Sequence, residues 1–284
     1  MAIGTVGVVG LGTMGAGIAQ VCLEAGHAVV ACDVEQRFVD AGTGRIEAGL
    51  AKRVEKGLME APAADAARRS LTATTDLGAL AAAELVIEAI VEELEPKREL
   101  FGRLDGICGP DTILATNTSA LSVSAIAAAS GRPSHVVGLH FFNPAPLMKL
   151  IEVVRTAVVD AAVFDAALAF ASGLGKEAVP CSDTPGFLVN RLLIPILNDA
   201  IRAMEETGAS PEDIDRAMRF GAGWPMGPFA LADLVGLDVH AHASEALWQG
   251  LREERMAPPA RLQRMVEAGL IGRKARQGFY DYRS

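Results

Sequence analysis

An α/β fold is predicted for this chain, with a doubly wound, mostly parallel sheet followed by an all-α C-terminal domain. Three features predict it. Short apolar runs alternate with helical patterns up to residue 183, a glycine-rich turn joins the first apolar run to the first helix, and strand signals cease afterwards. Alternation of strands and helices favours a parallel sheet covered on both faces. We therefore expect one domain over residues 1–183 and a helical domain over residues 184–284.

The strands of the first domain are expected where apolar and β-branched residues form short runs. These runs are residues 5–9, 28–32, 85–90, 112–115, 136–140, 150–154 and 177–180. Helical spacing of apolar residues follows the first run and recurs over residues 97–104 and 161–174. Gly26 is well placed to end the first of these helices.

Residues 41–70 are rich in Ala, Glu, Lys and Arg and are longer than a simple crossover requires. Their composition predicts a helical hairpin inserted in the first domain. Lys52, Arg53 and Lys56 give this hairpin a local basic face. The hairpin is either a solvated amphipathic pair of helices or a lid that meets an anionic substrate.

The second domain shows helix signals throughout. Pro185-Gly186 is expected to open a long apolar helix that runs to about Glu206 and is kinked at Pro195. Further helices are expected after Ser210, from Pro228 and over residues 260–268. A small helical domain this apolar often completes its core through a partner subunit, so we expect a homodimer.

Composition excludes several classes of protein. The net charge is −9 and no basic stripe is present, which argues against a nucleic-acid partner. The cysteines are scattered without metal-like pairing and indicate reduced thiols of a cytoplasmic protein; they are Cys22, Cys32, Cys108 and Cys181. We expect no metal.

The uncharged opening, residues 1–23, has the length of a membrane helix. Six glycines between Gly4 and Gly17 argue against that interpretation, and a signal peptide would begin with basic residues. The first strand begins almost at once, so we expect neither membrane insertion nor a targeting segment.

The glycine-rich turn Gly10-Leu11-Gly12-Thr13-Met14-Gly15 fits G-x-G-x-x-G and lies between a strand and a helix. Gly10 allows a tight turn, Gly12 lets a pyrophosphate approach the backbone, and Gly15 allows close packing of helix and strand. The free N–H groups of the helix N-terminus favour phosphate binding. These features predict a Rossmann-like dinucleotide site.

Asp33 ends the second expected strand, 18 positions after Gly15. Its carboxylate can accept hydrogen bonds from the adenine ribose hydroxyls and would repel a 2′-phosphate. This favours NAD over NADP as the cofactor. Arg37 nearby favours NADP instead, because an Arg can accommodate that phosphate.

His140 ends one expected strand, and Glu152 lies inside the next apolar run. At one edge of a sheet such a pair can act as a general base and the group that orients it. The alternative is a structural histidine and a surface glutamate. Glu92, Asn117 and Ser119 also fall at or just past the ends of expected strands, where ligands bind in doubly wound sheets.

The chain resembles the 3-hydroxyacyl-CoA dehydrogenase family, and most closely its short bacterial 3-hydroxybutyryl-CoA dehydrogenases. The resemblance covers nearly the whole length, in the family's order. It is carried by the segments VGVVGLGTMGAGIAQ, LVIEAIVEELEPK, ATNTSALSVS, GLHFFNPAPLMKLIEVV, DTPGFLVNRLL, MGPFALADLVGLDV and GFYDY.

The resemblance implies NAD-dependent oxidation of (S)-3-hydroxyacyl-CoA to 3-oxoacyl-CoA, and the reverse, with a short acyl chain. It implies that His140 is the catalytic base, Glu152 holds the imidazole, Ser119 bonds the reacting oxygen, and Asn190 binds substrate. The implied cofactor residues are Gly10, Gly12, Gly15, Asp33, Glu92, Lys97, Asn117 and Asn143. Lys52 and Lys56 align with the basic hairpin that meets coenzyme A in relatives.

Two positions depart from the family's pattern. Arg276 stands where relatives often show a glycine, which concerns the shape of that loop. Gly49 stands where some relatives place a serine near coenzyme A.

Three other interpretations stay open. A sugar-acid (gulonate-type) dehydrogenase of the same fold would keep His140, Glu152 and Asn190 without a coenzyme A site, although the basic hairpin argues against it. The broader β-hydroxyacid dehydrogenases use a catalytic lysine on the long interdomain helix, where this chain has Asn190. A non-catalytic dinucleotide-binding protein should have lost part of the catalytic set. This chain keeps all four of its residues, which are His140, Glu152, Asn190 and Ser119.

Overall fold

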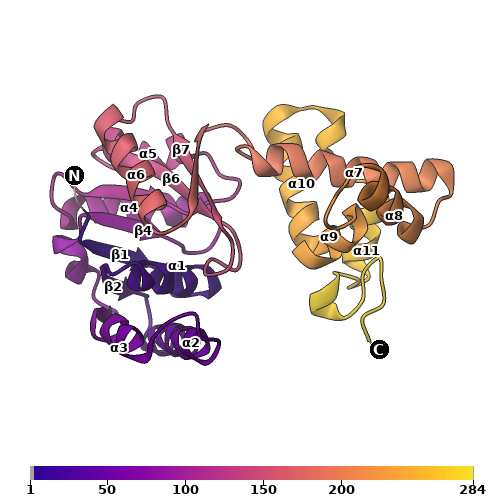
Figure 1. The fold of residues 1–284 in the computed structure, drawn as a ribbon. Coiled ribbons are helices and arrows are strands. Elements are labelled where there is room, and N and C mark those ends of the chain that lie inside the picture. The colour runs from indigo at the N-terminus through magenta and orange to yellow at the C-terminus, as the bar shows by residue number, and fades with distance from the viewer. Residues whose placement is uncertain (1–2, 284) are drawn as a thin grey trace. The chain divides into compact units, whose positions relative to one another are not determined.

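The computed structural model describes residues 3–283, which form two compact units, one ending at Thr184 and the other beginning at Pro185. In the first unit an eight-stranded sheet is covered by helices, and the second consists of helices and loops (Figure 1). The predicted fold class is confirmed. Among the described residues, no helix has the length and apolar character needed to span a bilayer.

The sheet has the strand order β3-β2-β1-β4-β5-β6-β7-β8. Its strands are β1 Thr5–Val9, β2 Ala28–Cys32, β3 Leu71–Thr74, β4 Leu85–Glu88, β5 Ile113–Thr116, β6 Val136–Phe141, β7 Leu150–Arg155 and β8 Glu177–Ser182. Neighbouring strands are parallel except for β6 and β7, which pair antiparallel. The sheet is therefore mostly parallel, as predicted, with β7 and β8 running against the other strands.

Each face of the sheet carries its own helices. The helices of the first unit are α1 Thr13–Glu24, α2 Gln36–Glu55, α3 Ala61–Arg69, α4 Leu94–Ile107, α5 Val123–Ala127 and α6 Ala161–Gly173. Alternate strand residues such as Val137 and Leu139 join a core with α1, α2, α3 and α6. The residues between them point to the other face, where a Cβ placed on Gly138 would meet Val123 of α5. By the same alternation, His140 and Glu152 point to the α5 face.

The predicted hairpin is formed by α2 and α3, although α2 begins at Gln36 rather than near residue 41. The shift follows from the short connection, since β2 ends at Cys32 and only residues 33–35 separate it from the helix. An additional strand that was not predicted, β3, follows the hairpin directly. This edge strand is short and half-exposed, so it lacks the apolar run by which the other strands are recognised.

The second unit contains α7 Val189–Thr207, α8 Pro211–Gly221, α9 Pro228–Val235, α10 Leu237–Leu251 and α11 Ala260–Glu267. The expected start of the long helix at Pro185-Gly186 was wrong. Gly186 has φ +76° and Phe187 has φ +49°, a left-handed backbone that cannot belong to an α-helix. Ser210 caps α8 as predicted, because its hydroxyl accepts a hydrogen bond from Asp213 N at 3.1 Å.

A buried polar network joins α7 to α10. Asn198 donates through Nδ2 to Ser244 Oγ at 2.7 Å, and Ser244 donates to the Met256 carbonyl at 2.6 Å. Asn198 Oδ1 is therefore the acceptor for His240 Nε2, 2.9 Å away. The side chains of Asn198, Ser244 and His240 are all fully buried. The network fixes the loop around Met256 against both helices.

Two buried carboxylates secure the C-terminal segment. Asp215 of α8 accepts hydrogen bonds from Phe229 N and Ala230 N, at the start of α9, and from the Tyr280 hydroxyl. Asp233 of α9 accepts from Phe279 N and Tyr280 N, each at 2.9 Å, and from the Tyr282 hydroxyl at 3.1 Å. Burial and the neighbouring Asp215 carboxylate raise the pKa of Tyr280.

Arg276 has a backbone conformation that glycine adopts more readily than other residues. Its backbone lies in the left-handed region, with φ +61° and ψ 13°, and its carbonyl accepts a hydrogen bond from Tyr282 N at 3.0 Å. A non-glycine residue there costs about 1–2 kcal/mol.

The free energy of unfolding should depend on pH because His240 is buried. Burial lowers the pKa of this imidazole from 6.5 to about 4. Between these values the unfolded chain binds a proton that the folded chain does not, so acidification favours unfolding. We expect the free energy of unfolding to fall by about 1.4 kcal/mol per pH unit from this group over that range. The His240→Asn variant should lose that part of the slope in urea titrations; equal slopes for both proteins would contradict the assignment.

Candidate active site

The glycine-rich turn between β1 and α1 leaves no room for side chains at two positions. Gly10 has φ +91°, and a Cβ there would lie 2.7 Å from the Ala89 carbonyl oxygen. A Cβ on Gly15 would lie 1.7 Å from the Gly10 carbonyl oxygen, so glycine is what lets α1 pack on the turn. At Gly12, the N-cap of α1, the space is open and no side chain caps the helix. The turn thus presents helix N–H groups to an open space, which fits a pyrophosphate.

Asp33 binds the same turn from the end of β2. Its Oδ2 accepts a hydrogen bond from Leu11 N at 2.7 Å, and its Oδ1 accepts one from Val34 N at 2.7 Å. The carboxylate is therefore oriented by the backbone, beside the site where a dinucleotide ribose would follow the pyrophosphate. Arg37 is paired with Glu35 at 2.9 Å and lies over the Phe38 ring.

A buried ion cluster lies beyond β4. Lys97 of α4 is almost fully buried, and its Nζ lies 2.6 Å from Glu88 Oε1 and 3.2 Å from Glu92 Oε2. Thr116 donates to the other oxygen of Glu88 at 2.7 Å. Burial alone would raise the pKa of Glu92, but the Lys97 ammonium and hydrogen bonds from Thr118 and Ser119 lower it below its ordinary value. Glu92 is therefore held as a carboxylate.

The loop after β5 carries Asn117 and Ser119. Asn117 Oδ1 accepts a hydrogen bond from Phe141 N at 2.9 Å, which ties this loop to the end of β6. Glu92 Oε1 accepts from the Thr118 hydroxyl at 2.6 Å and from Ser119 N at 2.7 Å. Ser119 is exposed, so its side chain is accessible to a ligand.

His140 and Glu152 meet directly across the antiparallel pair β6–β7. They are register partners, and Nδ1 of His140 lies 2.7 Å from Glu152 Oε2. Both side chains are buried, and the Phe142 ring lies 4.4 Å from the imidazole ring between centroids. An ionised carboxylate only accepts hydrogen bonds, so Nδ1 carries the hydrogen and the lone pair of a neutral ring lies on Nε2. This arrangement is suited to proton transfer at Nε2.

The remaining predicted site residues belong to other segments of the chain. Asn143 is exposed in the loop between β6 and β7. Asn190 belongs to the second unit, where it is the second residue of α7. Lys52 lies in the last turn of α2 and Lys56 directly follows that helix, both exposed. At Gly49 a Cβ would lie 2.0 Å from the Gln20 side-chain oxygen, so Gln20 occupies the space that a side chain at this position would need.

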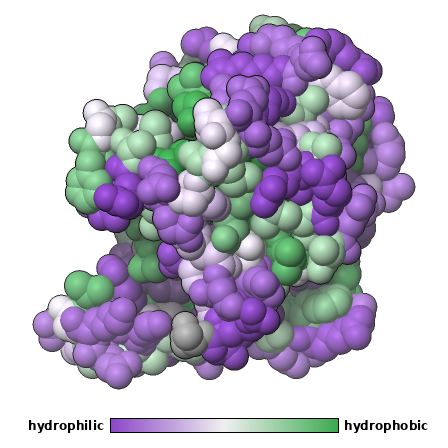
Figure 2. Space-filling model, turned by 90° about the vertical axis from the view of Figure 1, so that its right-hand side faces the viewer, coloured by the Kyte–Doolittle hydropathy of each residue, from purple (hydrophilic) through white to green (hydrophobic). Residues whose placement is uncertain are grey.

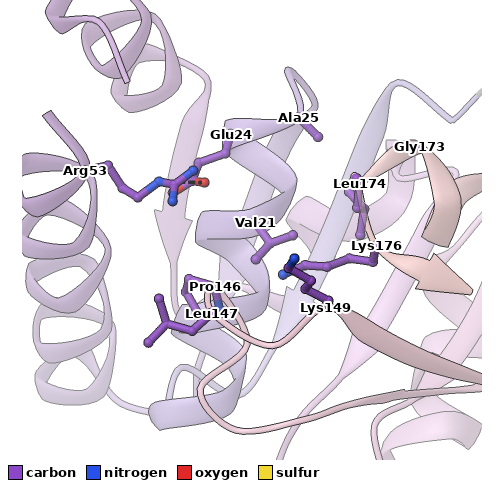
Figure 3. A pocket seen from close by; sticks show the side chains of 11 residues that line it. Val21, Glu24, Ala25, Arg53, Pro146, Leu147, Lys149, Gly173, Leu174 and Lys176 are labelled. Atoms are coloured by element: carbon purple, nitrogen blue, oxygen red, sulfur yellow. Dashed lines mark ion pairs between the residues drawn. The ribbon is translucent and has the colours of Figure 1, made fainter. Parts of the chain in front are cut away.

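A pocket of about 490 Å³ lies beside the end of α2 (Figure 3). Arg53 of α2 forms an ion pair with Glu24 on one side, and Lys149 and Lys176 lie on the other. Lys176 Nζ donates to the carbonyls of Ala145 and Met148 at 2.8 and 2.7 Å. Burial lowers the pKa of Lys176. The pocket was not predicted, because its lining comes from segments far apart in the sequence.

Sequence reasoning also missed Glu88 and Asp183. Glu88 is a carboxylate inside the apolar run of β4, nine residues before Lys97, which was a usable signal for a buried pair. Asp183 forms hydrogen bonds with the start of α5, about sixty residues earlier in the chain, and nothing local marks that contact.

Two family models match the chain. Residues 5–184 match the NAD binding domain of 3-hydroxyacyl-CoA dehydrogenase, and residues 186–282 match its C-terminal domain. The chain belongs to the 3-hydroxyacyl-CoA dehydrogenase family. It is therefore an oxidoreductase whose first unit is an NAD-binding domain, and the predicted family is confirmed.

Individual relatives agree with this assignment. The chain is 45% identical to the 3-hydroxybutyryl-CoA dehydrogenase of Mycobacterium tuberculosis over 283 residues, which is 99% of each protein. It is 45% identical to the 3-hydroxyadipyl-CoA dehydrogenase of Escherichia coli, of which it spans 59%. The crystal structure of (S)-3-hydroxybutyryl-CoA dehydrogenase from Ralstonia eutropha matches with a TM-score of 0.96 and 37% identity, covering 100% of both chains.

Proposed function

We propose that this member of the family oxidises short-chain (S)-3-hydroxyacyl-CoA, such as 3-hydroxybutyryl-CoA, to the 3-oxoacyl-CoA, and catalyses the reverse reaction. The observation that carries the proposal is the buried hydrogen bond of 2.7 Å between His140 Nδ1 and Glu152. A general base and its orienting carboxylate are what hydroxyl oxidation requires. The names of the relatives support the choice of substrate.

In the proposed mechanism, His140 Nε2 takes the proton of the 3-hydroxyl while the C3–H bond breaks and the carbonyl forms. The hydride leaves C3 with both electrons, and a bound NAD would supply its acceptor. Glu152 stabilises the imidazolium that results and keeps Nδ1 protonated. Ser119 donates a hydrogen bond to the reacting oxygen, and Asn190 of the second unit binds the substrate. In the reverse direction the imidazolium returns the proton to the oxygen.

The cofactor residues proposed for NAD follow from the same geometry. Gly10, Gly12 and Gly15 form the pyrophosphate turn, and Asp33 receives the adenine ribose hydroxyls. Glu92, Lys97, Asn117 and Asn143 are proposed to shape or contact the nicotinamide end. Because Lys97 is almost fully buried against Glu88 and Glu92, its part is to hold Glu92 in place.

Coenzyme A is proposed to meet the exposed Lys52 and Lys56, since its phosphates are anionic. The pocket that includes Arg53 and Lys149 is lined by the residue that directly follows Lys52 in the chain, which supports this placement (Figure 3). A sugar-acid dehydrogenase would not need such a basic surface. A non-catalytic protein would not need the His140–Glu152 pair.

NADH oxidation with acetoacetyl-CoA tests the substrate class. We expect rapid turnover with the thioester and little with free acetoacetate, because the free acid lacks the phosphates. The rate with 3-oxoadipyl-CoA should be compared with the rate with acetoacetyl-CoA, because relatives are named for the adipyl and the butyryl thioester. Turnover of free hydroxy acids or sugar acids alone would contradict the proposal.

The double variant Lys52→Ala/Lys56→Ala tests the proposed coenzyme A contact in the same assay. It should raise KM for acetoacetyl-CoA about tenfold, the equivalent of about 1.4 kcal/mol, without changing KM for NADH. Arg68→Ala/Arg69→Ala removes two charges from α3 and is the matched control. An equal change in both double variants would mean that net charge alone is measured.

His140→Gln should lower kcat by about 10³-fold while NADH affinity, measured by fluorescence titration, stays unchanged. Glu152→Gln should lower kcat by at least about 10²-fold, because an amide can donate to Nδ1 and so reverse the tautomer of the ring. If Glu152→Gln instead lowers stability and leaves the kcat of the folded fraction intact, Glu152 is structural.

The Asp33 carboxylate is proposed to select NAD. Asp33→Ala should lower the ratio of kcat/KM for NADH over NADPH by about 10–100-fold, since it removes both the ribose hydrogen bonds and the repulsion of a 2′-phosphate. Asp40→Ala removes an exposed carboxylate of α2 and serves as control. An unchanged ratio in Asp33→Ala would show that another group reads the ribose.

The predicted C-terminal domain, residues 184–284, is proposed to carry substrate binding and dimerisation. Its helices expose Leu192, Phe220 and Val239, at 66%, 78% and 50%. Hydrophobic surface (green) also appears in several separate places among hydrophilic residues on the face drawn in Figure 2. We expect light scattering to give the mass of a homodimer; the mass of one chain, 29.7 kDa, would contradict this.

A further inference from the structure

Asp183 connects the end of β8 to the start of α5. Its backbone N–H donates to the Arg155 carbonyl at 3.0 Å, so the residue is fixed by the β7–β8 pair. Its carboxylate accepts hydrogen bonds from the Ser122 hydroxyl at 3.1 Å, Val123 N at 3.0 Å and Ser124 N at 2.7 Å. These N–H groups belong to the first turn of a helix and have no partner within it. One carboxylate therefore satisfies the start of α5.

The segment that Asp183 holds also carries Asn117 and Ser119. At its other end, Glu92 accepts hydrogen bonds from the Thr118 hydroxyl and from Ser119 N. Two carboxylates, one beyond β4 and one beyond β8, thus hold the two ends of residues 117–124. Between them, the Thr118 hydroxyl accepts a hydrogen bond from Leu121 N at 2.9 Å, which shapes the turn.

The start of α5 also packs tightly against β6. A Cβ placed on Gly138 would lie 3.0 Å from a methyl group of Val123 and 2.7 Å from Val154 Cβ. Gly138 stands two residues before His140 on the same face of the strand. The position of Val123, which Asp183 caps, is therefore tied to the strand that carries His140. Ser122 and Ser124 are exposed, so loss of the carboxylate would let the segment turn toward water.

We propose that Asp183 is a positioning residue for hydroxyacyl oxidation, which acts by holding the 117–124 segment so that Ser119 meets the reacting oxygen. This inference rests on the proposed function. Asp183 itself touches neither substrate nor cofactor in this scheme. A displacement of about 1 Å in a group that contacts the reacting atoms can lower a rate by about 10²-fold.

A double-mutant cycle tests whether Asp183 acts through Ser119. Asp183→Ala should lower kcat for acetoacetyl-CoA reduction by about 10–100-fold, leave NADH affinity unchanged, and change KM for the thioester less than kcat. In the Ser119→Ala background the same substitution should lower kcat less than about threefold. Asp183→Asn, which keeps one carbonyl oxygen as acceptor, should restore part of the lost kcat.

Ser210→Ala is the matched control, because it also removes a helix cap and lies in the second unit. It should lower the thermal midpoint without lowering kcat. An equal loss of kcat from Asp183→Ala in both backgrounds, or an unchanged kcat with a lower thermal midpoint, would overturn the inference. If Asp183→Ala does not fold, Asp183→Asn is measured in both backgrounds by the same criterion. A wild-type chain without thioester turnover would overturn the proposed function itself, and the inference with it.

Discussion

The antiparallel pairing of β6 with β7 is the interaction on which the candidate site depends. It places His140 directly opposite Glu152, and both side chains are buried on the α5 face. Burial of an imidazole beside a carboxylate is tolerated when they form a hydrogen bond, here at 2.7 Å. A slip of one residue would turn Glu152 to the other face of the sheet. Gly138 lets the two strands and α5 pack closely in this register, because a side chain there would meet Val123 and Val154.

Around this pair, carboxylates organise the backbone. Asp33, Glu92 and Asp183 each accept backbone N–H groups from a neighbouring loop or helix start. Each stands beyond the end of a strand, where the sheet fixes its backbone. A loop held in this way keeps its conformation at little entropic cost when a ligand arrives, because its ordering is already complete in the folded protein. The glycine turn, the Ser119 loop and the start of α5 are therefore preorganised by the same device.

Much of the fold was predictable from local patterns. Most strands are buried apolar runs, the glycine turn has a defined spacing, and Ser210 is a recognisable cap. The half-exposed β3 and the left-handed Phe187 were not predictable, because neither carries a local signal that distinguishes it from a loop or a helix start. His140 and Glu152 were foreseen as partners since their strands are adjacent in sequence. The contact of Asp183 with α5 depends on how distant segments pack, which no spacing reveals.

The two buried aspartates of the second unit make its stability depend on the C-terminal segment. Asp215 and Asp233 accept hydrogen bonds from Phe279, Tyr280 and Tyr282. The C-terminal segment therefore supplies donors to two carboxylates that are buried in the helical unit. Their removal would leave two carboxylates buried with fewer donors, a costly state. Residues 279–282 therefore contribute to the stability of this unit, and a proteolytic cut before Phe279 would destabilise it as a core mutation does.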